Sequence, residues 1–269
     1  MAMTTSYLNR GEGRIAYDVT GAGPLVICLP GMGDLRSVYR FLAPALVESG
    51  FRVATMDLRG HGDSDATFSA YDDVAAATDA LALIDHLGAD HALLVGNSMT
   101  GGSAVWAAAE APDRVAGLVL VDPFVRNPKS NLLMTFAFRA GVMRPWGPAV
   151  WKGYYRRLYP GRPPADLTEY QRRQAESLRP KWRAFVRTTR TSHAPAEARL
   201  GEVRAKALVV MGDKDPDWTD PVAEARWIES TLGAELLLVE GAGHYPMAEY
   251  PEVVNPAVVA FAQRIHARA

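Results

Sequence analysis

The chain alternates short apolar, β-branched runs with longer segments in which apolar residues recur at helical spacing. The apolar runs predict strands at residues 14–19, 25–29, 52–56, 92–95, 118–121, 207–211 and 235–239. The segments between several of them predict helices at residues 36–49, 72–87, 99–111 and 221–232. Continuous apolar strands that alternate with helices are typical of a mostly parallel sheet covered on both faces. Right-handed crossovers make this a doubly wound α/β sheet, which binds ligands at the carboxyl ends of its strands.

One long segment interrupts this alternation. Between residues 123 and 204 no strand pattern appears, and the helical spacing is broken repeatedly by prolines. An unstructured connection of that length is uncommon in a compact domain. We therefore predict an insertion of three to five helices, residues 123–204, after the strand that ends at Val121, and a sheet domain formed by residues 1–122 and 205–269.

The insertion differs from the rest of the chain in charge. The whole chain has a net charge of −1, but residues 123–204 hold 14 Arg and 3 Lys against 5 acidic residues, so their balance is +12 against −13 elsewhere. The basic insertion either docks on the acidic sheet domain with a merely solvated outer face, or attracts an anionic substrate or an acidic partner protein. The near-neutral total, without single-sign tracts, gives no argument for binding nucleic acid.

Cysteine usage and the N-terminal pattern are those expected of a cytoplasmic protein. Cys28 is the only cysteine, which excludes an intrachain disulfide, and its apolar surroundings predict a buried side chain rather than a reactive thiol. The N-terminus has no basic stretch followed by an apolar one, so we expect no secretory signal. No run of eighteen apolar residues occurs, so we expect no membrane span.

The most informative segment for chemistry is the one around Ser98. A predicted strand leads directly into Gly96-Asn97-Ser98, and a predicted helix follows at once. So sharp a turn strains the backbone of the serine and requires small neighbours, while the helix N-terminus favours negative charge that develops beside it. A serine in such a turn is a candidate nucleophile, although the motif alone is a weak signal.

Two further segments place candidate partners after other strands. His244 follows the last predicted strand in a glycine-rich loop, and a neutral imidazole is the base that a serine nucleophile requires. Asp213, Asp215 and Asp217 come just after the strand at residues 207–211. A triad acid must hold the second nitrogen of the histidine, and the spacing alone leaves all three acids open.

The order serine, acid and histidine, each after a strand, is that of the α/β-hydrolase triad, and the chain resembles this family. Gly96-Asn97-Ser98-Met99 is similar to its nucleophile elbow, Gly212-Asp213-Lys214-Asp215 to its acid loop and Gly243-His244-Tyr245-Pro246 to its histidine loop. Leu29-Pro30-Gly31-Met32-Gly33 resembles its oxyanion loop, and residues 56–65 resemble the turn after its next strand. The resemblance covers the sheet domain and leaves the insertion, which the family would call a cap, almost unconstrained.

The resemblance implies an α/β-hydrolase fold with a helical cap inserted after the sixth strand. It also implies a catalytic triad of Ser98, Asp215 and His244. The oxyanion hole would be formed by the backbone N–H groups of Met32 and Met99. Neither a cofactor nor a metal ion is implied.

Two residues compete with this assignment and one departs from the family pattern. Asp122 ends its own predicted strand and is a rival acid, because some relatives take their acid from that strand. His61 is a rival base, but its Gly-His-Gly turn is a structural hallmark of the family. Thr100 stands where glycine is usual, and a β-branched residue there crowds the elbow, which Gly101 and Gly102 could relieve.

The default reaction for these residues is cofactor-free acyl transfer to water through an acyl-enzyme. The insertion is rich in aromatic residues, and some of them should line the cleft between cap and sheet. We therefore expect a small, largely apolar or aromatic substrate with an ester-type bond. The candidate substrate-binding residues are Phe124, Trp146, Trp151 and Tyr245.

Three alternatives remain open. Gly96-Asn97-Ser98-Met99 is also similar to the elbow of meta-cleavage-product hydrolases, which split carbon–carbon bonds of carboxylates that an arginine-rich cap could bind. A thioesterase that serves an acidic carrier protein explains the basic cap equally well. A ligand receptor or signalling protein on the same fold would retain the triad but turn over slowly or once.

Overall fold

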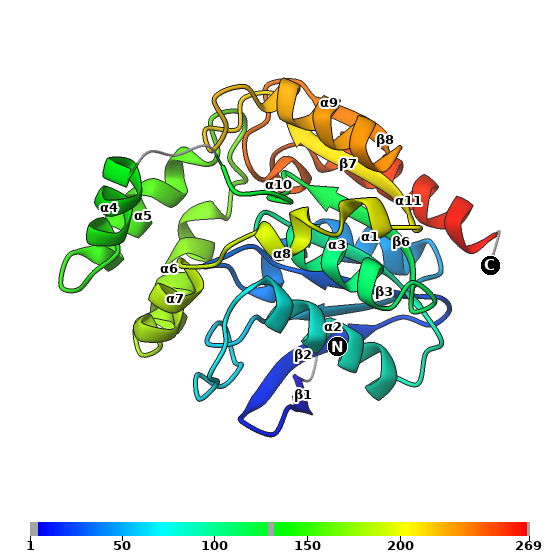
Figure 1. Ribbon diagram of the computed structural model, residues 1–269, viewed down its shortest axis with the longest axis horizontal. Coiled ribbons are helices and arrows are strands. Elements are labelled where there is room, and N and C mark those ends of the chain that lie inside the picture. Colours follow the sequence, from blue (N-terminus) through cyan, green and yellow to red (C-terminus); the bar gives the residue numbers. More distant parts are fainter. Residues whose placement is uncertain (1–4, 129–131, 268–269) are drawn as a thin grey trace.

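The computed structural model describes residues 5–128 and 132–267. Its centre is an eight-stranded sheet in the order β1-β2-β4-β3-β5-β6-β7-β8 (Figure 1). The strands are β1 (Ser6–Asn9), β2 (Arg14–Thr20), β3 (Leu25–Leu29), β4 (Arg52–Met56), β5 (Ala92–Asn97), β6 (Val115–Val121), β7 (Lys206–Gly212) and β8 (Glu235–Val239). Strands β3 to β8 pair in parallel, and β1 and β2 are antiparallel. The predicted doubly wound, mostly parallel sheet is confirmed.

All seven predicted strands are present, and one strand was missed. The missed strand, β1, lies at the edge of the sheet, and only Leu8 of its four residues is buried. A single buried position gives no alternating pattern that the sequence could reveal. Because β1 comes first, the strand that ends at Val121 is the sixth in the chain.

Helices cover both faces of the sheet. One face packs against α1 (Leu42–Glu48) and α11 (Pro251–His266), and the other packs against α2 (Asp73–His86), α3 (Thr100–Glu110) and α9 (Pro221–Leu232). A short helix, α10 (Pro246–Glu249), precedes α11. In residues 5–128 and 132–267, no helix combines the length and the apolar character needed to cross a membrane.

The helix predicted at residues 36–49 is divided in the structure. A 3₁₀ turn, η1 (Arg36–Tyr39), comes first, and α1 begins at Leu42. Pro44 explains the break, because proline lacks an N–H and clashes inside a helix but is tolerated in a first turn. Proline also explains why the sequence pattern did not predict α11, which contains Pro256 in its interior.

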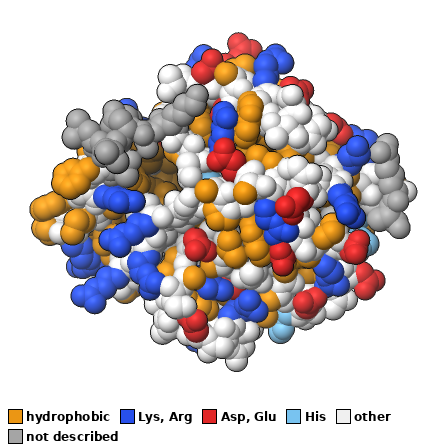
Figure 2. Space-filling model, in the orientation of Figure 1, with side chains coloured by type: hydrophobic (Ala, Val, Ile, Leu, Met, Phe, Trp, Pro, Cys, Tyr) orange, Lys and Arg blue, Asp and Glu red, His pale blue; other side chains and the backbone are white. Residues whose placement is uncertain are grey.

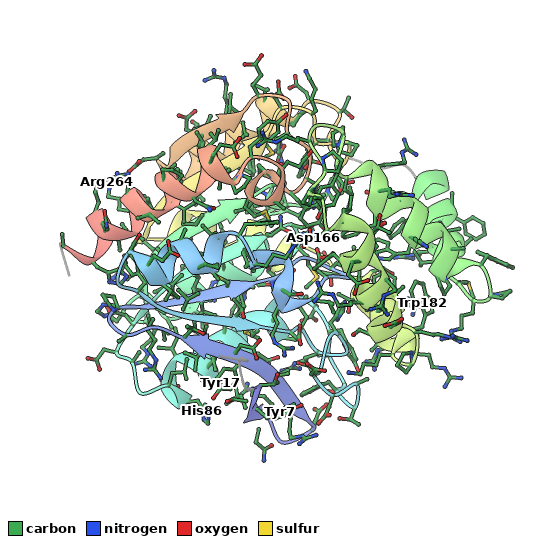
Figure 3. All side chains as sticks on the ribbon, turned by 180° about the vertical axis from the view of Figure 1, so that it is seen from behind. Tyr7, Tyr17, His86, Asp166, Trp182 and Arg264 are labelled. Atoms are coloured by element: carbon green, nitrogen blue, oxygen red, sulfur yellow. The ribbon has the colours of Figure 1, made fainter. Side chains whose placement is uncertain are left out.

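Within the described residues, the segment between β6 and β7 holds five helices and a 3₁₀ turn. They are α4 (Leu132–Gly141), α5 (Gly147–Arg157), α6 (Leu167–Leu178), α7 (Trp182–Thr188), α8 (Ala194–Glu197) and η2 (Leu200–Glu202). Helices α4 to α7 lie together beside the sheet, on the left of Figure 1, whereas α8 packs against α2 and α3. Trp182 connects the start of α7 to the end of α4, because its indole N–H donates to the carbonyl of Val142 at 2.9 Å (Figure 3).

Cys28 lies in the centre of the sheet, as its apolar run predicts. Its side chain is fully buried among residues of β3 and the helices of one face. Burial raises the pKa of the Cys28 thiol far above its ordinary value, which keeps the group protonated. The structure therefore gives Cys28 the properties of a small core residue.

Candidate active site

Ser98 occupies the turn between β5 and α3. Its φ of 58° lies in the left-handed region, which is strained for a residue other than glycine. The backbone holds this conformation: Ser98 N donates to Val121 O at 2.9 Å, and Ser98 O accepts from Phe124 N at 3.0 Å. A side chain at Gly96 would lie 2.3 Å from the carbonyl oxygen of Thr100. The strand, strained serine and helix thus form the sharp elbow that the sequence predicts.

Thr100 fits this elbow through its hydroxyl group. Thr100 Oγ1 accepts from Asn97 N at 3.0 Å and lies 2.8 Å from Leu29 O and 2.9 Å from Asn97 O, the two acceptors for its one proton. The family usually has glycine at position 100, but in this structure it is the next residue, Gly101, that has no room for a side chain. A Cβ on Gly101 would approach Pro123 Cβ to 2.3 Å. The threonine therefore fastens the elbow to the end of β3.

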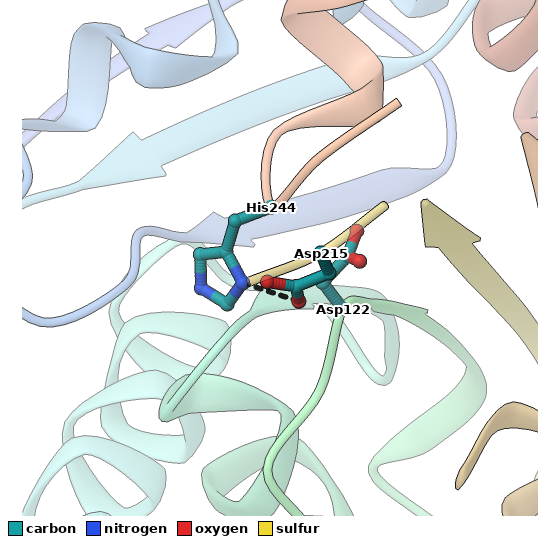
Figure 4. Close-up of side chains that lie close together, drawn as sticks. All are labelled: Asp122, Asp215 and His244. Carbon is teal, nitrogen blue, oxygen red and sulfur yellow. Dashed lines mark hydrogen bonds and ion pairs between the residues drawn. The ribbon is translucent and has the colours of Figure 1, made fainter. Parts of the chain in front are cut away.

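His244 and Asp215 form a buried hydrogen-bonded pair (Figure 4). Nδ1 of His244 lies 2.7 Å from Oδ2 of Asp215, and a carboxylate oxygen of Asp217 lies 3.7 Å from the same nitrogen. Because a carboxylate accepts, Nδ1 carries the proton and Nε2 is left to accept one. Asn97, directly before Ser98, donates from Nδ2 to the carbonyl oxygen of His244 at 3.3 Å. The histidine loop is thereby tied to the elbow.

The charges around His244 favour its protonated form. Burial opposes protonation, but the negative charges of Asp215 and Asp217 outweigh it and raise the pKa of His244. Asp217 is itself held by the hydroxyl of Tyr154, which donates to its carboxylate. This arrangement can stabilise an imidazolium that forms when His244 takes a proton.

Asp122, the rival acid, lies next to this pair but bonds elsewhere. Its Oδ1 accepts from Gly212 N at 3.0 Å. Burial and the charge of Asp215 raise the pKa of Asp122 well above its ordinary value. Asp122, Asp215 and His244 bring possible metal-ligand atoms within 4.8 Å of one another. Within this cluster, Nδ1 of His244 and Oδ2 of Asp215 are hydrogen-bonded to each other.

The predicted oxyanion loop packs directly on the elbow. A Cβ on Gly31 would lie 3.0 Å from Cβ of Ser98. Gly33 has a φ of 82° and donates its N–H to Nε2 of His61 at 3.0 Å, while Nδ1 of His61 lies 2.9 Å from the carbonyl of Arg59. Burial lowers the pKa of His61 to about 4, which keeps it neutral. His61 therefore supports the loop by accepting a hydrogen bond. Met32, from this loop, packs against the small apolar cluster of Leu58, Ala76 and Met99.

Three of the four candidate substrate-binding residues lie near this centre. The ring of Phe124 is 6.1 Å from that of His244 and stacks on Trp218 at 4.6 Å. Trp151 is buried against the oxyanion loop, where a Cβ on Gly33 would meet its ring. Tyr245 is buried beside His244, with ring centroids 5.2 Å apart.

The prediction for Trp146 is not supported by its position. Its side chain is 54 % exposed, and its indole N–H donates to the carbonyl of Ala140. Trp151 and Tyr155 are four residues apart on one face of α5, whereas Trp146 precedes Trp151 by five residues and so falls on another face. The helix period therefore turns Trp146 toward solvent.

A buried carboxylate that the sequence analysis missed links the insertion to this centre. Asp34 directly follows the oxyanion loop and accepts from the hydroxyls of Tyr155 at 2.7 Å, Tyr170 at 2.9 Å and Tyr245 at 2.6 Å. Gln174 adds a weaker contact at 3.3 Å. Burial raises the pKa of Asp34 to about 6 despite these bonds. The position of Asp34 directly after the oxyanion loop could have marked it as a candidate. Its partners on α5 and α6, however, belong to no recognisable sequence motif.

Most basic residues of the insertion are exposed, whereas Arg126, Lys181 and Arg199 are half-buried. No arginine in the described part of residues 123–204 is buried, and Figure 2 shows blue side chains gathered over the helices on the left. Some pair with acids of the sheet domain, as Arg126 does with Glu224. In the reverse sense, Arg40 of the sheet domain pairs with Asp166 of the insertion (Figure 3). These contacts agree with docking between parts of opposite charge.

Comparison with known proteins identifies the family. A model of the Alpha/beta hydrolase family matches residues 26–257. The chain belongs to the alpha/beta hydrolase family. Membership in this family, together with relatives that are hydrolases, makes the chain a hydrolytic enzyme.

Individual relatives within the alpha/beta hydrolase family differ in what they act on. The chain is 29 % identical to 2-(acetamidomethylene)succinate hydrolase of Mesorhizobium japonicum over 263 residues, which cover 93 % of this chain and 92 % of the relative. It is 30 % identical to 2-hydroxy-6-oxo-6-phenylhexa-2,4-dienoate hydrolase of Comamonas testosteroni, over 75 % of this chain and 74 % of that one. An esterase from Exiguobacterium antarcticum shares the fold, with a TM-score of 0.83 at 19 % identity over 97 % of this chain and 100 % of that one.

Proposed function

We propose that the chain is a cofactor-free serine hydrolase that cleaves a carboxylic ester-type bond of a small, largely apolar or aromatic substrate. The observation that carries this proposal is the buried bond of 2.7 Å between His244 and Asp215, in a loop tied through Asn97 to the strained Ser98. This combination supplies a nucleophile, a base and an orienting acid at one edge of the sheet.

In the proposed reaction, Ser98 Oγ attacks the substrate carbonyl carbon and passes its proton to Nε2 of His244. Asp215 holds the imidazolium, and the backbone N–H groups of Met32 and Met99 stabilise the oxyanion. His244 then protonates the leaving alcohol, which departs and leaves an acyl-enzyme. A water molecule, deprotonated by His244, attacks the acyl group, so the acid is released and Ser98 regains its proton.

We further propose that residues 123–204 act as a cap over this site, with residues 1–122 and 205–269 as the catalytic core. The cap reaches the centre at two points. His244 N donates to Leu158 O at 2.9 Å, and the tyrosines of α5 and α6 bind Asp34. The aromatic rings of Phe124 and Trp151 at the centre favour an apolar or aromatic substrate.

A second candidate reaction is cleavage of a carbon–carbon bond in a carboxylate. The elbow Gly96-Asn97-Ser98-Met99 and the relative from Comamonas testosteroni, a dienoate hydrolase by name, favour it. Esters, thioesters, lactones and a 2-hydroxy-6-oxo-dienoate, assayed in parallel, separate the candidates. If the dienoate were turned over far faster than every ester, carbon–carbon bond cleavage would replace ester hydrolysis as the proposed reaction.

The proposal is tested by replacing Ser98 with alanine. Ser98→Ala should lower kcat for a 4-nitrophenyl ester by about 10⁴–10⁶-fold, the loss that removal of a nucleophilic serine causes elsewhere. Ser49→Ala is the matched control, because Ser49 lies before β4 at the opposite edge of the sheet. Steady multiple turnover by the wild type also argues against a receptor. Full activity of Ser98→Ala with an unchanged circular dichroism spectrum would end the proposal.

A further inference from the structure

The insertion runs along the backbone of the histidine loop. Directly after α5, the carbonyl oxygen of Leu158 accepts a hydrogen bond from His244 N at 2.9 Å. A Cβ on Gly243 would lie only 2.4 Å from the same carbonyl oxygen, and one on Gly161 would lie 2.1 Å from the carbonyl oxygen of Gly241. The two backbones are therefore in direct contact, and neither glycine leaves room for a side chain between them.

Glu249, a buried residue of α10, holds these two segments together. Its Oε2 accepts a hydrogen bond at 2.6 Å from the backbone N–H of Gly243, the residue directly before His244. Its Oε1 accepts from Gly161 N of the insertion at 2.9 Å. The backbone carbonyl of Glu249 also accepts from Nε of Arg162 at 3.0 Å. Because each carboxylate oxygen binds a different segment, one side chain links the insertion to the histidine loop.

Asp34 makes the same kind of link on the other side of His244. Its Oδ2 accepts at 2.6 Å from the hydroxyl of Tyr245, the residue directly after His244. Its Oδ1 accepts from the hydroxyls of Tyr155 and Tyr170 of the insertion. Two buried carboxyl groups therefore flank the histidine, and each uses one oxygen for the histidine loop and the other for the insertion.

The two carboxyl groups fix the backbone on both sides of His244. Hydrogen bonds to a carboxylate are shorter and stronger than those between neutral groups. Burial raises the pKa of Glu249 to about 7 and that of Asp34 to about 6 despite these bonds, so both groups are largely ionised at pH 8. The bond of 2.7 Å from Nδ1 of His244 to Asp215 depends on where this backbone lies. In the proposed reaction, so does the reach of Nε2 to Ser98.

We propose that Glu249 is a positioning residue for His244, which it holds, together with Asp34, against the docked insertion. This inference rests on the proposed function, because it takes His244 as the base that activates Ser98. The insertion then positions the base in addition to covering the site. A displacement of about 1 Å between reacting groups can lower a rate about 10²-fold, so the loss of one of these links is measurable in kcat.

The first test is kinetic and uses Glu249→Gln, whose amide has the same size but only one acceptor oxygen for the two N–H groups. At pH 8, kcat for a 4-nitrophenyl ester should fall by about 10–100-fold. KM should stay within about threefold, because His244 acts in both acylation and deacylation.

Glu224→Gln is the matched control for this variant. Glu224 is also buried and binds the insertion, through Arg126, but it has no hydrogen bond to the histidine loop among the described residues. Its replacement should lower the free energy of unfolding and leave kcat within about threefold of the wild type.

A proton NMR spectrum separates positioning from a general loss of stability. The Nδ1 proton of His244, bonded to Asp215 at 2.7 Å, should give a resonance far downfield, assigned by its loss in His244→Gln. The Nδ1 proton of His193, which is also bonded to a buried carboxylate, provides an internal reference. In Glu249→Gln the His244 resonance should shift or broaden while that of His193 stays in place. In Glu224→Gln the His244 resonance should stay unchanged.

The outcomes that would overturn the inference are specific. In folded Glu249→Gln, an unchanged His244 resonance or a kcat within about threefold of the wild type would do so, as would an equal loss of kcat in Glu224→Gln. If Glu249→Gln fails to fold, Glu249→Asp takes its place, because it keeps the charge but is too short to reach both N–H groups. No ester turnover by the wild type, with the His244 resonance still displaced in the Glu249 variant, would refute the proposed function and leave the positioning of His244 standing.

Discussion

His244 directs its Nδ1 proton to Asp215, 2.7 Å away, although the carboxyl of Asp122 lies in the same cluster. Asp122 instead accepts from the backbone of Gly212. The two carboxyl groups therefore have different partners, and their amide variants should differ in effect.

Asp215→Asn should lower kcat by about 10⁴-fold, because an amide that donates to Nδ1 stabilises the wrong tautomer of the base. Asp122→Asn keeps an oxygen acceptor for Gly212 N and leaves the bond between His244 and Asp215 in place, so kcat should stay within about tenfold of the wild type. Both are measured with a saturating 4-nitrophenyl ester. The reverse order of effects would move the acid to Asp122.

Asp217 should shift the acidic limb of the pH profile, in addition to the larger effect of Asp215. The reaction requires neutral His244, and the negative charge of Asp217, 3.7 Å from Nδ1, raises the pKa of that histidine. Asp217→Asn removes this charge, lowers the pKa and so moves the acidic limb of kcat/KM to lower pH. Asp213→Asn is the control, because Asp213 belongs to the same loop but binds Gly241 N. A limb that stays in place or moves to higher pH would contradict this role.

Thr100 should stabilise the elbow through its hydroxyl. Thr100→Val keeps the shape but leaves Asn97 N and Leu29 O without that partner, which should lower the free energy of unfolding by about 1–3 kcal/mol. Thr100→Ser keeps the hydroxyl and should lose less. Denaturant titrations of the two variants decide this: equal losses would show that the methyl group, not the hydroxyl, matters.

Tyr155 should stabilise the junction between the insertion and the oxyanion loop. Tyr155→Phe removes a hydrogen bond to the buried Asp34, which should lower the free energy of unfolding by about 1.5–3 kcal/mol when that carboxyl is charged. Because the pKa of Asp34 is about 6, the loss should be larger at pH 8 than at pH 5. Among the described polar groups, the hydroxyl of Tyr159 contacts only that of Tyr155. Tyr159→Phe should therefore lower the free energy of unfolding by less at both pH values. If Tyr155→Phe lowered the free energy of unfolding equally at pH 5 and pH 8, the charge of Asp34 would be excluded as the cause.

The sheet and the positions of the candidate triad could be predicted because they follow from local pattern. Buried parallel strands are continuous apolar runs, and their carboxyl ends meet at one edge. Ser98 directly follows β5, and Asp215 and His244 come three and five residues after β7 and β8, so all three lie at this edge.

Contacts between the insertion and the sheet domain could not be predicted in the same way. Asp34 and Tyr155 are 121 residues apart, and His193 and Asp73 are 120 apart. The proline-broken segments between them fix neither the direction of a helix nor the face that it buries. For the same reason the sequence pointed to Trp146, which faces solvent, and did not predict the contact between His193 and Asp73.

The central claim, that Ser98 carries a covalent acyl group, is tested most directly by intact-protein mass spectrometry. The protein is treated with a fluorophosphonate, and in parallel quenched during turnover of a slow ester. The account predicts one adduct per chain, located on Ser98 by peptide sequencing, and no adduct on Ser98→Ala. An adduct on another residue, or undiminished labelling of Ser98→Ala, would contradict it.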